Sequence, residues 1–120
     1  MREIKFRGKV KYNGNHKFSG DWIYGYYRNN DNGNAFITET LDEYSNYIFD
    51  ETEVDESTIG QYTGLKDKNG VEIYENMIIN NKYIVIYDFC KFVLKNIKNG
   101  NITDFKKDGI YEITREYFEQ

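Results

Sequence analysis

The stretch from Ile59 to Glu75 constrains the fold more than any other part of the chain. Asp67, Asn69 and Gly70 lie at its middle, and these residue types suit the tight turn of a β-hairpin because Asn and Gly tolerate positive φ. The stretch therefore predicts a central hairpin. The apolar residues that it could bury are Tyr62, Leu65, Val71 and Ile73.

The composition extends this prediction to the whole chain. It holds 12 Tyr and 8 Phe, no proline, and Ala35 as its single alanine. Aromatic and β-branched residues favour strands, whereas helices favour alanine and straight-chain residues. We therefore expect a mainly β fold of short antiparallel strands, with turns made by Gly, Asn and Asp and with one or two short helical turns.

The alternation of apolar and polar residues places the other strands. We expect strands at 2–7, 21–28, 34–40, 77–79, 82–89 and 92–97. Residues 47–49 could form a strand or stay in a loop. Asp55 is expected to cap a helical turn at 56–59, and a second helical turn is expected within 112–119. The predicted core residues are Ile4, Phe6, Ile23, Phe36, Tyr62, Leu65, Ile73, Ile84 and Ile86.

A chain of 120 residues suits one domain, so we expect residues 1–120 to fold as a single unit. Cys90 is the only cysteine, which excludes an internal disulfide, and its apolar surroundings predict a buried side chain. The charged N-terminus resembles no signal peptide, and no apolar run is long enough to span a membrane. These features predict a soluble, cytoplasmic protein.

Three motifs resemble the YopX family of bacteriophage and prophage proteins. The first is the start, Met1 to Arg7, and the second is Trp22-Ile-Tyr-Gly-Tyr26. The third spans residues 53–75 and reads Glu-Val-Asp-Glu-Ser-Thr-Ile-Gly-Gln-Tyr-Thr-Gly-Leu-Lys-Asp-Lys-Asn-Gly-Val-Glu-Ile-Tyr-Glu. The motifs occur in the family's order and cover about the first 80 residues.

The resemblance implies a small β-rich protein, of an SH3-like or other small-barrel type, encoded by a phage or prophage of Gram-positive bacteria. It implies no activity, because the family has no settled biochemical role. The family usually has Gly-Asp after the third motif, where this chain has Asn76-Met77. Asn can replace Gly at positive φ, so we expect the turn to survive. The part after about residue 80 resembles the family less and is interpreted as divergent or trimmed.

Charge is segregated along the chain, although the net charge is only −4. Residues 29–65 carry nine acidic side chains and no Lys or Arg, whereas residues 1–17 carry a net charge of +5 and residues 82–107 a net charge of +4. Such segregation can steer a charged partner. Alternatively, the charged segments attract each other or are simply solvated.

One candidate site is an acidic, protein-binding surface. Its residues would be Asp50, Glu51, Glu53, Asp55 and Glu56. The acids could imitate the charge of nucleic acid toward a host DNA-binding protein. They could also be a solvated edge that protects a strand from aggregation. They lack the spacing and the central glycine of an EF-hand, so we expect no metal ion there.

A second candidate site combines basic and aromatic side chains. If strand 2–7 lies beside strand 21–28, cations and rings would share one face and could bind single-stranded nucleic acid. Alternatively, the aromatic side chains fill the core. The residues of this candidate are Arg2, Lys5, Arg7, Trp22, Tyr24 and Tyr26.

We find no pattern that predicts catalysis or a cofactor. His16, the only histidine, lies in a polar loop, so we expect a solvated side chain and no catalytic role. One histidine and one cysteine are too few for a tetrahedral zinc site within one chain, and no phosphate-binding motif is present. We therefore expect no catalytic, cofactor or metal site. The favoured hypothesis is a non-enzymatic accessory protein that binds a host or phage protein, and the alternative is a nucleic-acid-binding small β-barrel.

Exposed sheet edges in such a small β protein lead to a prediction about assembly. Unpaired strand edges can join edges of other copies, so we expect a homodimer or a larger homo-oligomer. Light scattering of the purified protein should give a mass above that of one chain. A monomeric mass at high protein concentration would contradict this expectation.

Overall fold

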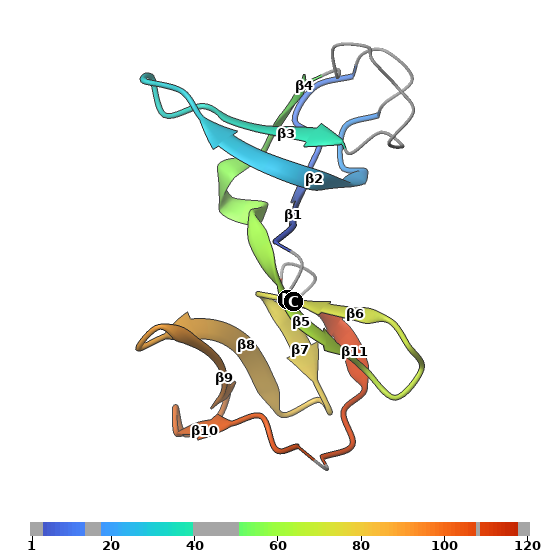
Figure 1. Cartoon of the computed structure of the whole chain (residues 1–120), viewed down its shortest axis with the longest axis vertical. Helices are drawn as coiled ribbons and strands as arrows, with labels where there is room; N and C mark the ends of the chain where they lie inside the picture. The colour runs from blue at the N-terminus through green and yellow to red at the C-terminus, as the bar shows by residue number, and fades with distance from the viewer. Residues whose placement is uncertain (1–3, 14–17, 40–50, 108, 118–120) are drawn as a thin grey trace. The chain divides into compact units, whose positions relative to one another are not determined.

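The computed structural model describes residues 4–13, 18–39, 51–107 and 109–117. These residues form antiparallel strands and one 3₁₀ turn, η1, so the predicted mainly β class is confirmed (Figure 1). The elements are β1 (Phe6–Lys9), β2 (Trp22–Asn29), β3 (Ala35–Glu39), β4 (Glu51–Val54), η1 (Glu56–Thr58), β5 (Gly60–Lys66), β6 (Glu72–Tyr74), β7 (Met77–Ile79), β8 (Tyr83–Asp88), β9 (Lys91–Asn96), β10 (Ile102–Asp104) and β11 (Ile113–Glu116).

The contacts group the chain into two compact units, with the boundary between Gln61 and Tyr62. In the first unit the strand order is β4-β3-β2-β1-β5, and a further bridge joins Val54 of β4 to Val10 after β1. The expected cap is also present, because the Asp55 side chain accepts a hydrogen bond from the Ser57 N–H at the start of η1. One face of this sheet is apolar. Its buried residues are Val10, Ile23, Ala35, Ile37 and Val54.

Gly25 allows β2 and β3 to approach closely. It lies on the apolar face between Tyr24 and Tyr26, as the alternation in the sequence predicts. A Cβ atom at this position would overlap the carbonyl oxygen of Thr38 and lie 2.9 Å from the Cα atom of Glu39. Any larger residue at this position would therefore force the two strands apart.

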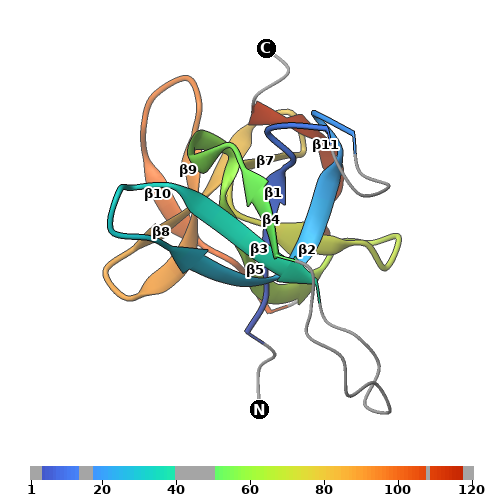
Figure 2. The same cartoon turned by 90° about the horizontal axis from the view of Figure 1, so that it is seen from above.

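The second unit contains the central hairpin and a five-stranded sheet. β5 continues into this unit and pairs with β6, and the sheet has the order β10-β9-β8-β7-β11. Figure 2 gives a second view of these strands. The unit has its own core. The buried residues of that core are Tyr62, Ile73, Tyr74, Met77, Ile79, Val85 and Leu94.

The predicted core is correct for three of its residues, since Ile23, Tyr62 and Ile73 are buried. Phe6, Phe36, Ile84 and Ile86 are only half-buried. The prediction is wrong for Ile4 and Leu65, which are exposed. Ile4 lies before the start of β1, and Leu65 follows Gly64, which has a φ of 87°. That irregularity shifts the β5–β6 register, so the strand alternation used for the prediction does not hold there.

Asparagines make several of the turns, as the sequence predicts. Asn76 has a φ of 71° and so replaces the family's glycine, and Asn80 and Asn81 have φ values of 55° and 54°. The β8–β9 turn is different, because Phe89 and Cys90 also have positive φ. Cys90 is exposed at this turn, so its predicted burial is wrong: the tight turn directs it away from the core.

The C-terminal segment also differs from its prediction. A helical turn was expected within residues 112–119. Ile113–Glu116 instead form β11 and pair with β7, and among the described residues of this segment only Tyr117 has 3₁₀ conformation. The exposed edge of β7 offers hydrogen-bond partners that override the local preference of the segment. Tyr117, directly after β11, is exposed. Residues 47–49 lie outside the described residues.

The corrected core gives a stability prediction. Ile73 is fully buried in the second unit, so Ile73→Ala should lower the free energy of unfolding by about 2–5 kcal/mol through lost contacts and a cavity. Leu65→Ala is the matched control, and because Leu65 is exposed its loss should stay below about 1 kcal/mol. Chemical denaturation measures both. Equal losses would contradict this assignment of the core.

Candidate functional site

Both candidate sites have members on the same face of the first sheet, opposite its apolar core. Strand register places Tyr26 of β2 beside Thr38 of β3, and Thr38 beside Glu51 of β4. The next row is Arg28, Phe36 and Glu53. Directly opposed residues point to the same side of a sheet, so aromatic and acidic side chains share this surface. We call it the outer face.

Arg7 does not provide the exposed cation that the sequence predicts. It lies opposite Tyr24 on the outer face, but only 1% of its surface is exposed. Its guanidinium carbon lies 3.8 Å from the centroid of the Trp22 ring, which is a favourable cation–π geometry. Arg7 and Trp22 therefore stabilise each other's position and form part of the structure of the outer face.

Tyr24 and Tyr26 are the accessible aromatic residues of the outer face. Their exposed fractions are 43% and 61%, so the alternative that these two rings fill the core is wrong. Trp22 is half-buried and lies opposite Lys9, whose ammonium nitrogen is 5.3 Å from the Trp22 ring centroid. Lys5, which precedes β1, is also half-buried.

Glu51 forms a two-point ion pair with Arg28. Nε and Nη2 of Arg28 lie 2.7 Å and 2.6 Å from the two carboxylate oxygens of Glu51. These hydrogen bonds lower the pKa of the Glu51 carboxyl below its ordinary value and raise that of Arg28. The same guanidinium carbon lies 4.9 Å from the Phe36 ring centroid. The pair is therefore oriented on the outer face by both charge and ring contact.

The other predicted acids have separate surroundings. Glu53 lies 3.6 Å from the ammonium nitrogen of Lys11, Asp55 caps η1, and Glu56 is exposed in the first turn of η1. Asp50 lies outside the described residues, as do Arg2 and His16. Basic residues before residue 29 thus partly neutralise a segment that contains no Lys or Arg of its own.

Arg28, Phe36 and Lys11 were missing from the sequence-based candidates. Arg28 is in the predicted strand 21–28, and Phe36 was assigned to the core instead of the surface. Strands were predicted at 21–28 and at 34–40, but only the register of their pairing places Arg28 beside Phe36. The sequence therefore indicated the two strands without the alignment that the structure supplies.

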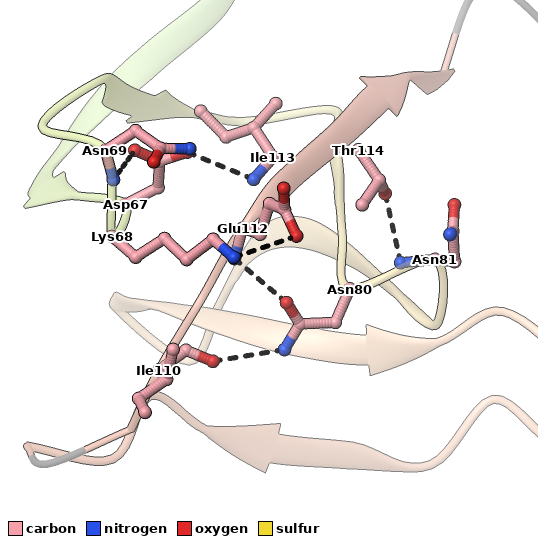
Figure 3. A network of polar contacts seen from close by, with 9 residues as sticks. All are labelled: Asp67, Lys68, Asn69, Asn80, Asn81, Ile110, Glu112, Ile113 and Thr114. Carbon is pink, nitrogen blue, oxygen red and sulfur yellow. Dashed lines mark hydrogen bonds and ion pairs between the residues drawn. The ribbon is translucent and has the colours of Figure 1, made fainter.

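A polar network in the second unit surrounds Asp67 (Figure 3). Oδ1 of this buried residue accepts hydrogen bonds from the backbone N–H groups of Asn69 and Val71, each at 2.9 Å. Oδ2 accepts one from the N–H of Ile113 at 3.2 Å. Burial alone raises the pKa of Asp67, but the backbone hydrogen bonds and the charge of Lys68 outweigh it, and the pKa is lowered.

The rest of the network joins the same segments. Lys68 and Glu112 form an ion pair at 3.4 Å, and the Asn80 side chain bonds to the Glu112 N–H and the Ile110 carbonyl. In Figure 3 these contacts connect the β5–β6 turn and the β7–β8 turn to the chain around β11. These hydrogen bonds and the ion pair hold the segments against one another, so the network stabilises this junction.

The second unit also has a hollow of about 390 Å³. Asn80, Asn96, Asn99 and Asn101 contribute to its lining, together with Tyr83 and Tyr111. Several of these side chains hold local backbone: the Asn96 oxygen accepts from the Lys98 and Asn99 N–H groups, and the Asn99 oxygen accepts from Asn101. The hollow therefore has polar walls fixed largely by turn structure.

Across residues 4–13, 18–39, 51–107 and 109–117, no three His, Cys, Asp or Glu side chains converge closely enough to hold a metal ion. Over the same ranges, no helix has the length and apolar character needed to cross a membrane.

Comparison with known proteins identifies the family. The family described as YopX protein has a model that matches residues 5–117. This chain belongs to the YopX family. The match to the YopX model includes the segment after residue 80, and therefore both units. A comparison with curated proteins gives no match.

The contribution of Asp67 to the stability of this YopX chain can be tested by an isosteric substitution. Asp67→Asn keeps an oxygen for the turn but sets an amide donor against the Ile113 N–H. The free energy of unfolding at pH 7 should fall by about 1–3 kcal/mol, because a buried donor loses its acceptor. Chemical denaturation measures the loss, and faster exchange of the Ile113 amide should accompany it.

The pH dependence of the stability that Asp67 contributes follows from the lowered pKa of its carboxyl group. A lowered pKa in the folded state adds stability above the unfolded pKa of about 3.9, and this is lost as the pH falls through the folded pKa. The difference between wild type and Asp67→Asn should therefore shrink in acid. Glu112→Gln is the control, since its exposed ion pair should contribute less than about 1 kcal/mol. A pH-independent difference would contradict this role of Asp67.

Proposed function

We propose that this chain is a non-enzymatic accessory protein of a phage or prophage that binds a host or phage protein in the cytoplasm of the host cell. The observation that carries the proposal is the outer face of the first unit, where Tyr24 and Tyr26 are exposed beside the Arg28–Glu51 pair. Membership of the YopX family supports the phage setting through the resemblance described above.

The residue types of the outer face suit protein recognition. Tyr, Trp and Arg carry much of the binding energy in protein interfaces, because they bury large areas and still make polar contacts. Tyr24 and Tyr26 project from a regular strand, and Arg28 is held by both Glu51 and Phe36. Such fixed side chains lose little conformational entropy when a partner binds.

The acidic residues favour a basic partner surface. Glu51 and Glu53 share the outer face with Tyr26 and Phe36, and Asp55 and Glu56 follow β4 directly. Carboxylates around an aromatic centre would attract a basic protein and discourage an acidic one. The partner that fits this proposal is therefore a protein with a positively charged surface that accommodates two tyrosine side chains.

Nucleic acid is the alternative partner. Lys9 lies opposite Trp22 on the outer face, in the row next to Tyr24, so a cation and stacking rings do occur together there. Two features make this alternative weaker. Arg7 is buried against Trp22 instead of being available to phosphates, and carboxylates on the same face would repel a phosphate backbone.

A pull-down with matched variants tests the proposal. Tagged wild type, Tyr26→Ala and Tyr87→Ala would be incubated with lysate of the host bacterium, with and without nuclease. Tyr87 is the control, because it is a similarly exposed tyrosine on β8 of the second unit. The purified partner should bind Tyr26→Ala about 30-fold more weakly, as for a hot-spot residue of about 2 kcal/mol. Tyr87→Ala should bind as wild type does.

Charge variants separate the two kinds of partner. For a basic protein, Glu53→Gln should slow association, while Lys5→Gln and Lys9→Gln should have little effect. For nucleic acid the lysine variants should weaken binding and reduce its salt dependence. Nuclease-sensitive capture with the second pattern would overturn the proposed function in favour of the alternative. Retention of full affinity by Tyr26→Ala would overturn the assignment of the outer face.

A further inference from the structure

The two edges of the five-stranded sheet in the second unit differ in their hydrogen bonding. At the β11 edge, Asp67 accepts the Ile113 N–H, and the Lys68 N–H donates to the Tyr111 carbonyl. The β5–β6 turn thus covers the start of that edge strand. β10 forms the other edge, beyond β9 (Figure 1).

The register shows which main-chain groups of β10 point outward. Asn96 N–H donates to the Asn101 carbonyl at 2.8 Å, and the pairing continues as Ile102 with Lys95 and Thr103 with Leu94. Hydrogen-bonded pairs alternate along an antiparallel ladder, so Thr103 bonds to Leu94. The N–H and C=O groups of Ile102 and Asp104 therefore point away from β9. Within the described residues, no hydrogen bond is made to those outward groups.

The side chains of β10 are also accessible. Half of the Ile102 surface and 66% of the Asp104 side chain are exposed. Hollows lie along this strand: one of about 370 Å³ is lined by Phe89, Val93 and Ile102 among others, and the asparagine-lined one of about 390 Å³ includes Thr103. If a strand of another protein paired with β10, its side chains would point alternately to the two faces of the sheet. Those side chains could enter these hollows.

The charged residues around β10 indicate which charge a pairing segment should carry. Residues 91–107 contain five lysines and one acid, Asp104. Lys91 pairs with Asp104 at 2.8 Å, and both side chains are more than half exposed. Lys95 is exposed opposite Ile102. Carboxylates of an incoming segment would find cations at the edge strand, whereas a basic segment would be repelled.

We propose that β10 is a docking edge for an extended acidic segment of a partner protein, which adds to the sheet as a sixth strand. Main-chain hydrogen bonds to Ile102 and Asp104 hold the segment, and the lysines select its acidic residues. Alternate apolar side chains of the segment enter the hollow beside Phe89. This mode of recognition uses backbone for affinity and pockets for specificity. It does not depend on the outer face of the first unit.

The test uses a displayed library of random heptapeptides and three full-length proteins. Wild type is compared with Ile102→Pro, which removes one outward N–H but leaves the bonds between Thr103 and Leu94. Proline is tolerated at outward positions of edge strands. Ile102→Val is the matched control, because it keeps the N–H and the branched side chain. Thermal unfolding checks that each variant is folded.

Selection on wild type should enrich acidic peptides that contain alternating apolar residues. Loss of one main-chain hydrogen bond should make these peptides bind Ile102→Pro about threefold to tenfold more weakly, and Ile102→Val should bind nearly as well as wild type. In amide exchange, the bound peptide should protect the Ile102 and Asp104 amides and leave the Leu94 amide unchanged.

Three results would overturn the proposal: no enrichment on wild type above Ile102→Pro, enriched peptides without acidic residues, or equal binding by both variants. Protection of the Ile102 and Asp104 amides that rises with protein concentration, without peptide, would assign the edge to a second copy instead. If Ile102→Pro does not fold, peptides N-methylated at alternate residues replace it. N-methylation of one set of alternate peptide residues should then prevent binding, and N-methylation of the other set should not. Equal binding by the two kinds of methylated peptide would overturn the proposal.

Discussion

Antiparallel strand pairing, with side chains alternating between two faces, is the constraint on which the rest of this structure depends. In β2, Ile23 and Gly25 face the core, while Tyr24 and Tyr26 face outward. A register shift of one residue would exchange these faces. The close contact of Gly25 with β3 opposes such a shift, because other positions of β2 carry side chains that could not fit there.

Each of the two compact units holds a charged side chain in place by local contacts. In the first, the Arg7–Trp22 contact contributes to the same surface that exposes Tyr24 and Tyr26. In the second, Asp67 accepts hydrogen bonds from Asn69 and Val71 in its own turn and from Ile113 at the start of β11. In these contacts Arg7 and Asp67 hold neighbouring parts of the chain together. Their energetic contribution is to hold strands in register, which gives the proposed binding surfaces a defined shape.

Much of the fold could be predicted from local signals, and the candidate sites could be predicted only in part. The turn at Asn80 and Asn81 and the cap at Asp55 follow from residue type alone. The sequence also indicated that Trp22, Tyr24 and Tyr26 share a face. It could not indicate that Arg7 is buried, because that depends on which strand lies beside β1. Arg28 and Glu51 are 23 residues apart, and their contact requires the β2–β3–β4 register.

The sequence by itself determined the strand-rich class, most turns and the family, because composition, alternation and turn residues act over a few neighbours. Tertiary structure decided the rest. It made β11 a strand by offering it the edge of β7 and exposed Leu65 through an irregular register. It also placed Cys90 in a turn whose two central residues, Phe89 and Cys90, are not usual turn residues. The physical reason is that strand partners are distant in sequence, so local preference cannot specify which edge a segment joins.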